Sequence, residues 1–508
     1  MDIKKIETLG QLRGAGYKPK TVKEELRDNL IKRIESGTPV FEGVYGYEES
    51  VIPDIERAIL SKHNIILLGL RGQAKTRIAR QMTDLLDDYV PVVAGSELND
   101  DPMRPISRYA IDQIDEHGDN TAITWLAKED RYAEKLATPD VTVADLIGDV
   151  DPIKAANLKL NYSDERVIHY GIVPRSNRCI FVINELPDLQ ARIQVSLFNI
   201  LQEGDVQIRG FKLRLPLDME FVFTANPEDY TNRGSIVTPL KDRIESQILT
   251  HYPKTMEISR KITQQEARIE ETQSNKVNVP DALADLLEQI AIEARDSEYI
   301  DAKSGVSARL TISAYENLVS AAERRALKAG DKNTTARVSD LWGVIPAITG
   351  KVELVYEGEQ EGPQMVAQHL IGKAIRSQFV KYFPNPEDGK KKLRRKEGEE
   401  SPGKQPFDHV KEWFASGNQI DLMVDSSDKE YYKALDSVAG LAAVVDQFAP
   451  GLKEQDQYFF MEFVLHGLAE YSQLSKARLE TGHRFNDLFD SVFSVGDLLG
   501  DEGGEYTD

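Results

Sequence analysis

The sequence predicts an α/β fold with a parallel sheet in its first half and an α-helical region in its second. Four short apolar runs, at residues 65–68, 90–94, 179–183 and 221–223, are typical of strands that are buried on both faces. Amphipathic helical patterns lie between these runs, and this alternation indicates parallel strands joined by crossover helices. After about Tyr252 the strand patterns end and helical patterns dominate. We therefore expect a sheet domain followed by helical regions.

The composition limits the class of protein. The chain has 508 residues, with 63 Lys and Arg against 84 Asp and Glu, which gives a formal net charge of −21. Such a chain is too acidic for general binding to nucleic-acid phosphates. Its single cysteine excludes a disulfide framework and a Cys-based zinc site. No apolar run approaches the roughly 18 residues of a membrane span, and the N-terminus lacks a signal-peptide pattern. We expect a cytoplasmic protein of several domains.

Changes of pattern along the chain predict four regions. The clearest helix covers Arg309 to Ala329 and ends at Gly330, a residue type that commonly terminates helices. The basic run at residues 390–396 predicts an exposed loop. The regions are an N-terminal helical segment (1–35), an α/β domain (36–252), an α-helical domain (253–352) and an α-helical C-terminal extension (353–508).

A glycine-containing loop follows the first apolar run and precedes a helical pattern. It matches the phosphate-binding template G-x-x-x-x-G-K-[ST], except that an alanine replaces the last glycine. In such a loop, backbone N–H groups turn inward to hold phosphate oxygens, which requires small residues. The methyl group of the alanine disfavours the positive φ that this conformation needs. The loop residues are Gly69, Leu70, Arg71, Gly72, Gln73, Ala74, Lys75 and Thr76.

Two side chains at the end of this loop carry the expected chemistry. Lys75 would reach the β- and γ-phosphates of a nucleotide, and the Thr76 hydroxyl would ligate Mg²⁺. The start of the following helix adds partial positive charge. The alternative interpretation is a simple glycine turn before a helix, but the order strand, loop, helix favours a phosphate site.

Polar residues follow two of the other predicted strands. Asn184 and Glu185 end the run at 179–183, and Asn226 ends the run at 221–223. The carboxyl ends of parallel strands meet at one edge of a sheet, where ligands bind in open α/β folds. In P-loop ATPases an Asp-Glu pair stands where this chain has Asn184 and Glu185. The Asp holds Mg²⁺, and the Glu polarises the attacking water. Because Asn184 is uncharged, we expect weaker Mg²⁺ binding or slower turnover.

Three further residues are candidates for contact with a nucleotide. Asn226 would orient a water molecule against the γ-phosphate, or else begin a turn before Pro227. Arg243 is a candidate arginine finger, which supplies positive charge to phosphoryl transfer from a neighbouring subunit. Arg309 opens a helix of the second domain and would touch phosphates across an interdomain cleft. For both arginines the alternative is an ordinary surface contact.

These five elements, in this order, resemble those of AAA+ ATPases. They are most similar to the branch that contains the MoxR ATPases and the ATPase subunit of magnesium chelatase. The resemblance covers roughly residues 38–350. It includes an insertion at Ala144 to Val173 and a hairpin with Gln202-Glu203-Gly204 at its corner. It identifies Walker A with Gly69, Gly72, Lys75 and Thr76, Walker B with Asn184 and Glu185, sensor 1 with Asn226, the arginine finger with Arg243 and sensor 2 with Arg309.

This resemblance implies a P-loop AAA+ core, an α-helical lid domain, and ATP and Mg²⁺ as cofactors. It further implies a homo-oligomeric ring, usually a hexamer, that remodels a partner protein. In this branch the usual partner carries a von Willebrand A domain. The chain itself lacks the metal-binding D-x-S-x-S pattern of that domain, because Lys429 stands where the second Ser is needed after Asp425. That segment predicts a helix-capping loop instead.

Two alternatives to a MoxR-type motor stay open. A magnesium-chelatase-type ATPase subunit shares every motif named above. A weakly active or inactive nucleotide-binding scaffold is favoured by Ala74 and Asn184, but disfavoured by the full set of other chemical groups. A sigma-54-type activator is disfavoured, because the GAFTGA loop is absent from the sequence.

Overall fold

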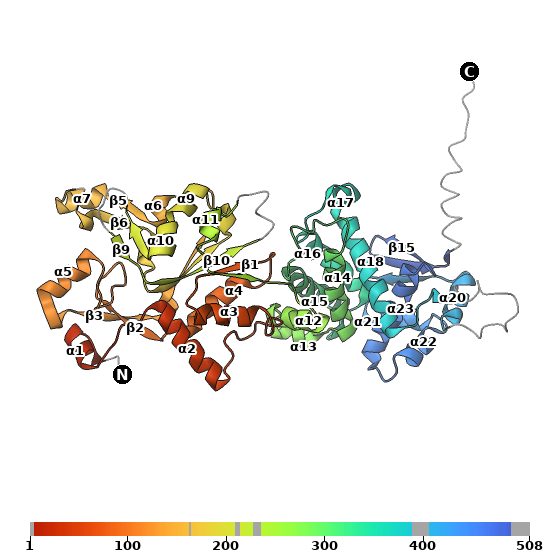
Figure 1. Cartoon of the computed structure of the whole chain (residues 1–508). Coiled ribbons are helices and arrows are strands. Elements are labelled where there is room, and N and C mark those ends of the chain that lie inside the picture. Colours follow the sequence, from red (N-terminus) through yellow and green to blue (C-terminus); the bar gives the residue numbers. More distant parts are fainter. Residues whose placement is uncertain (1–4, 162–163, 209–213, 227–234, 389–405, 489–508) are drawn as a thin grey trace, which may run out of the picture. The chain divides into compact units, whose positions relative to one another are not determined.

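The computed structural model (Figure 1) describes residues 5–161, 164–208, 214–226, 235–388 and 406–488. The basic run at 390–396 and Pro227 lie outside these residues. The chain divides into two compact units, residues 1–252 and 253–508. Among the described residues, none of the helices combines the length and apolar character needed to cross a membrane.

The first unit is built around a five-stranded parallel sheet. Its strand order is β11-β1-β10-β7-β4. The strands are β1 (Ile65–Leu68), β4 (Tyr132–Leu136), β7 (Cys179–Asn184), β10 (Met219–Ala225) and β11 (Ser246–Leu249). The helices of this unit are α1 (Leu9–Gly14), α2 (Val22–Ser36), α3 (Val51–Leu60), α4 (Lys75–Gln81), α5 (Arg108–His117), α6 (Val143–Leu146), α7 (Pro152–Leu158), α8 (Ile172–Arg175), α9 (Ala191–Ser196), α10 (Phe198–Glu203) and α11 (Thr238–Lys241).

Both faces of this sheet are buried, which explains the continuous apolar runs of its central strands. Successive side chains of a strand point to opposite faces. Leu67 and Val182 pack in a core formed with α2, α3 and α4, whereas Leu68 and Phe181 pack in a core formed with α6, α8, α9 and α10. The expected α/β class with a parallel sheet is confirmed.

One predicted strand lies elsewhere, and two strands of the sheet, the edge strands β4 and β11, were not predicted. The run at 90–94 belongs to β2 (Tyr89–Val93), which pairs antiparallel with β3 (Ile123–Ala127) outside the five-stranded sheet. Pro91 lacks an N–H donor and is suited only to an edge strand. One edge position of the parallel sheet is taken by β4, whose YAEKL sequence is not an apolar run.

Two excursions leave the core of the first unit. The segment from Ala144 to Val173 holds a small antiparallel pair, β5 (Gly148–Val150) and β6 (Ile168–Tyr170), with α7 between them. After α10 the chain turns at Gly204, whose φ is +67°, into the hairpin of β8 (Asp205–Gln207) and β9 (Arg214–Pro216). The hairpin expected after Gln202-Glu203-Gly204 is therefore present.

The second unit is mainly helical. The helix α15 (Arg309–Ala329) has the predicted bounds, and Gly330 follows it with a φ of +79°. The other helices are α12 (Met256–Glu266), α13 (Glu271–Lys276), α14 (Asp281–Arg295), α16 (Ile345–Thr349), α17 (Tyr356–Glu361), α18 (Pro363–Tyr382), α20 (Asp408–Ala415), α21 (Asp428–Asp436), α22 (Leu441–Phe448) and α23 (Glu454–Glu470); Val277–Asn278 (β12) pairs with Thr334–Thr335 (β13).

One hydrophobic core runs through this whole unit. It extends from Val277 to Phe485 and includes side chains of α14, α15, α18 and α23. The expected division between residues 352 and 353 falls inside this core. Ser427 caps α21, and its hydroxyl accepts the N–H of Glu430 at 3.3 Å, so the predicted capping loop is confirmed.

The second unit also contains a small sheet that the sequence did not predict. The strands β14 (Ile420–Met423), β16 (Gly482–Asn486) and β15 (Ser475–Leu479) form an antiparallel sheet in that order. These strands mix charged and apolar residues, which resembles the pattern of exposed helix or loop.

Candidate functional site

The sheet topology brings three of the predicted stretches to one edge. β10 lies between β1 and β7, and all three strands are parallel, with Leu68 paired to Ala225 and Phe223 paired to Ile183. The loop at 69–76 follows β1, Asn226 follows β10, and Asn184 and Glu185 end β7. These stretches therefore share the carboxyl edge of the sheet, the edge at which such folds bind ligands.

The loop at 69–76 makes a tight turn into α4. Gly72 and Ala74 both have left-handed backbones, with φ of +73° and +57°. Ala74 thus adopts the conformation that its methyl group disfavours, at a cost of roughly 1–2 kcal/mol. Contacts from outside the loop offset this cost.

Gly69 and Thr250 provide the closest of these contacts. A Cβ on Gly69 would lie 1.8 Å from Thr250 Oγ1, so no larger residue fits there. The Thr250 hydroxyl donates to Gln73 Oε1 at 2.7 Å, and its backbone N–H donates to Leu68 O at 2.7 Å. Thr250 directly follows β11, so the end of that strand holds the loop.

Two tyrosines contact the loop from other segments. The Tyr47 hydroxyl donates to Gln73 O at 3.1 Å and to His251 O at 2.8 Å, and burial raises the pKa of Tyr47 to about 12. The Tyr252 hydroxyl donates to Arg71 O at 3.2 Å. Neither tyrosine nor Thr250 was predicted to contact the loop, because nothing in the local sequence pattern links them to it.

Lys75 and Thr76 occupy different environments. Lys75 is buried, and its ammonium group donates to the carbonyl oxygens of Gly69 and Leu70, the second at 3.0 Å. Thr76 is exposed at the start of α4. The amine is therefore held over the loop, while the hydroxyl is accessible to solvent.

Asn184 lies in a hydrogen-bond network that spans three adjacent strands. Its amide Nδ2 donates to Glu134 Oε1 of β4 at 2.8 Å, and its Oδ1 accepts the Thr224 hydroxyl of β10 at 3.1 Å. The Glu185 N–H donates to the Thr224 Oγ1 at 3.2 Å, and Glu185 itself has a left-handed backbone with a φ of +55°. The side chain of Asn184 is thus fixed from both sides.

Glu134 brings a carboxylate to the place where the sequence lacks one. Arg80, one helical turn after Thr76 on α4, forms an ion pair with Glu134 Oε2 at 3.1 Å, and the Tyr132 hydroxyl donates to the same oxygen at 3.0 Å. Glu134 was missed because its edge strand was missed. The sequence signal for such a residue was the absence of an Asp at position 184, which leaves a carboxylate to be supplied by another strand.

The two candidate arginines, Arg243 and Arg309, have other surroundings than the groups described above. The Arg243 guanidinium donates to Gln202 Oε1 at 2.8 Å and to Pro239 O at 2.7 Å. Among the described residues, it forms no hydrogen bond or ion pair with the loop at 69–76. Arg309 is the first residue of α15 in the second unit. The roles of both arginines stay predictions.

Comparison with known proteins gives weak similarities only. No protein-family model and no curated protein matches the chain. Among solved structures, NtrX from Brucella abortus in complex with ADP is 14% identical, with a TM-score of 0.37, over 72% of this chain and 68% of that one. Hsp104 with ATPγS and casein is 13% identical, with a TM-score of 0.36, over 61% and 50%. A protein from Cytophaga hutchinsonii, named as a candidate ATPase, is 18% identical, with a TM-score of 0.28, over 71% and 97%. The function must therefore be argued from the geometry.

Proposed function

We propose that this chain is an AAA+ ATPase that binds ATP and Mg²⁺ at the loop 69–76 and hydrolyses the nucleotide. The observation that supports this most is the shared sheet edge: the loop, Asn226 and the Asn184-Glu185 pair follow three adjacent parallel strands. A glycine turn that arose by chance would not place these groups together.

The loop residues fit a triphosphate. Gly69 leaves no space for a side chain, and Gly72 and Ala74 have the left-handed conformations that turn backbone N–H groups inward. The buried Lys75 ammonium group already lies against backbone carbonyl oxygens of the loop, within reach of phosphate oxygens in the same cradle. In this proposal Lys75 exchanges those carbonyl oxygens for phosphate oxygens.

The residues next to the loop fit a magnesium ion bound with the nucleotide. Among the described residues, no group of three or more His, Cys, Asp or Glu side chains forms a separate metal site. Thr76, Asn184 and Glu134 would hold the ion together with the phosphates. Bound there, the ion would neutralise phosphate charge during transfer. Glu134 supplies the negative charge that Asn184 lacks.

The remaining groups take roles in hydrolysis. Glu185 would polarise the attacking water, and Asn226 would orient it. Arg243 would act on the nucleotide of a neighbouring subunit in a homo-oligomeric ring, and Arg309 on the nucleotide of its own chain. By its resemblance, we propose a hexameric MoxR-type motor that remodels a partner protein with a von Willebrand A domain. A magnesium-chelatase-type subunit is an alternative with the same site.

The nucleotide site is tested by binding and hydrolysis in three variants. Lys75→Ala should weaken ATP binding by about 100-fold or more, because the only ammonium group in the cradle is lost. Glu185→Gln should bind ATP normally and release almost no phosphate. The control is Lys18→Ala, an exposed lysine of the same unit, which should change neither property. Unchanged ATP binding in Lys75→Ala, measured by calorimetry, would contradict the proposal.

A second candidate function is a nucleotide-binding scaffold without turnover, which the uncharged Asn184 favours. The same measurements separate the two. Tight ATP binding that depends on Lys75, with no phosphate release from the unmodified protein at any Mg²⁺ concentration, would identify the scaffold. Phosphate release that is lost in Glu185→Gln would identify the enzyme.

A further inference from the structure

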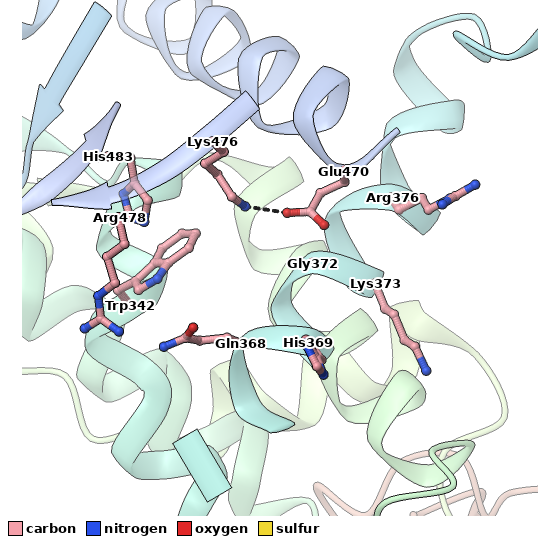
Figure 2. Close-up of a pocket in the computed structure, with 10 residues that line it drawn as sticks. All are labelled: Trp342, Gln368, His369, Gly372, Lys373, Arg376, Glu470, Lys476, Arg478 and His483. Carbon is pink, nitrogen blue, oxygen red and sulfur yellow. Dashed lines mark hydrogen bonds and ion pairs between the residues drawn. The ribbon is translucent and has the colours of Figure 1, made fainter. Parts of the chain in front are cut away.

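A cavity of about 400 Å³ lies within the second unit, far along the chain from the loop at 69–76. Figure 2 shows its walls: α18 on one side, and β15 and β16 with Trp342 on the other. A volume of this size is in the range of small-molecule sites. The lining residues are Trp342, Gln368, His369, Gly372, Lys373, Arg376, Glu470, Lys476, Arg478 and His483.

The cavity is lined by positive charge in a chain that is strongly negative overall. Four cationic side chains line it against a single carboxylate, that of Glu470. Glu470 forms an ion pair with Lys476, drawn as a dashed line in Figure 2. A Cβ on Gly372 would lie 2.6 Å from Glu470 Oε2, so the carboxylate also packs closely against α18. Arg376 forms an ion pair with Glu387 at 3.3 Å. Lys373 and Arg478 are therefore the two lining cations without a paired carboxylate among the described residues.

Several hydrogen-bond donors of this cavity have no acceptor within the described part of the chain, and two of them, Lys373 and Arg478, are exposed. Among the described residues, Lys373 and Arg478 form no hydrogen bond or ion pair, and neither does the side-chain amide of Gln368 or the indole N–H of Trp342. In Figure 2 the Gln368 side chain extends from α18 toward Trp342. These donors come from three separate segments of the chain. Polar groups that gather without acceptors favour a ligand rich in acceptors.

The wall opposite α18 also contains two neighbouring rings, those of Trp342 and His483, beside the cations of β15. The Trp342 and His483 rings lie 4.2 Å apart, and Lys476 Nζ lies 5.5 Å from the Trp342 ring centroid. Burial, reinforced by the nearby His466 and Lys476, lowers the pKa of His483 to about 3, so this ring is uncharged at neutral pH. His483 Nδ1 is buried without a partner among the described residues.

We propose that this cavity binds a small molecule that carries two or more negative oxyanion charges, as phosphate or carboxylate groups. Arg478 and Lys373 supply charge to it, with the planar guanidinium suited to paired oxygens. Gln368 and Trp342 donate neutral hydrogen bonds. This site is independent of the proposed nucleotide site, because every lining residue belongs to the second unit.

Calorimetry with two probes tests this proposal. Pyrophosphate and citrate are titrated into the full chain carrying Lys75→Ala, which removes the main cation of the loop at 69–76. The pocket variant adds Lys373→Gln and Arg478→Gln, and the control adds Lys332→Gln and Lys429→Gln, two exposed lysines of the same unit. We expect saturable binding that weakens with added salt, about tenfold or more weaker in the pocket variant and unchanged in the control.

The two probes distinguish the source of the oxyanion. Binding of pyrophosphate alone supports a phosphorylated ligand, and binding of citrate alone supports a polycarboxylate. Binding of both probes supports a site that accepts either kind of oxyanion. Gln368→Leu, which changes no charge, should weaken the same binding, so a general charge effect is excluded. The proposal is overturned if neither probe binds saturably at millimolar concentration, or if the pocket and control variants bind equally.

Discussion

The two ends of the five-stranded sheet carry charged residues of opposite character. At the carboxyl end, the ion pair of Arg80 with Glu134 is partly exposed, with 67% and 31% of the two side chains accessible. At the amino end, the charges are buried and paired. Arg131, which precedes β4, forms an ion pair with Glu25 at 2.6 Å, and both side chains are at most 4% exposed. Arg178, which precedes β7, pairs with Asp101 at 3.3 Å.

This difference shows that clustered charge alone does not mark a functional site. The amino-end pairs tie α2 and the segment near residue 100 to the sheet, where their removal would leave an unpaired buried charge. At the carboxyl end, Asn184 is held by hydrogen bonds to Glu134 and Thr224, and the Thr76 and Arg80 side chains are exposed. A candidate functional cluster is therefore distinguished from a structural one by its exposure to solvent and by its position at the carboxyl end of the strands.

The largest expected effect is on hydrolysis, from Arg243→Ala at the carboxyl side. An arginine finger contributes about 10³-fold or more to turnover, so phosphate release should fall by that factor while ATP binding stays unchanged. If the finger acts between subunits, mixing this variant with Glu185→Gln should restore part of the activity. Hydrolysis that survives the substitution would remove Arg243 from the site.

The matched control lies at the other end of the sheet. Arg131→Met leaves Glu25 buried without its partner, which typically costs about 3–5 kcal/mol of stability. Its thermal unfolding midpoint should drop, while ATP binding by the folded fraction is kept. Substitution of Arg243 would then lower hydrolysis without affecting stability, and substitution of Arg131 would lower stability without affecting ATP binding.

A smaller effect concerns pH and the amino end of β10. Glu220 is buried there, with Lys23 Nζ 3.9 Å away, and burial raises the pKa of Glu220 to about 8. The folded state thus prefers the protonated carboxyl group. Its contribution to stability is full below the unfolded pKa near 4.5 and is lost as pH rises through 8, at about 1.4 kcal/mol per pH unit.

Glu220→Gln cannot ionise and should remove this slope. The unfolding midpoint is measured between about pH 6.5 and 8, above the pKa of the neighbouring Asp218, which burial raises to about 6. The unmodified protein should lose stability across that interval, and the variant should lose much less. Equal slopes in the two proteins would show that Glu220 is ionised in the folded state.

The smallest expected effect separates Glu134 from Asn184. Glu134→Gln should weaken Mg²⁺ binding to the ATP complex about tenfold, which is about 1.4 kcal/mol, because the carboxylate beside Asn184 is lost. The double variant with Asn184→Asp should regain most of that affinity. The readout is Mg²⁺-dependent ATP binding by calorimetry, and Glu129→Gln, an exposed neighbour, is the control. No change in Glu134→Gln would exclude it from the metal site.

The parts of the fold that were predicted are those with a strong local pattern. The α15 bounds and the strands β1, β7 and β10 follow from periodicity and from apolar runs long enough to be buried on both faces. The loop at 69–76 was recognised because its residues are contiguous. For such elements a short window of sequence carries the whole signal.

The parts that were missed depend on partners far along the chain. β4 is an edge strand in which the charged Glu134 and Lys135 are adjacent, so it is not an apolar run. The run at 90–94 was wrongly assigned to the parallel sheet, because its Pro91 is unsuited to a central strand. The contacts of Thr250 with the loop, and of Glu134 with Asn184, join residues that are many positions apart. The cavity beside Trp342 likewise has no motif, since three segments of the second unit supply its walls.

The strand β11 has a mechanical consequence. It begins three residues after Arg243 and is followed directly by Thr250, whose hydroxyl donates to Gln73. Residues 243–250 therefore join Arg243 to the loop at 69–76 through a strand that is hydrogen-bonded to β1. In the proposed ring, contact of a neighbouring subunit with Arg243 would be coupled to the loop through these residues.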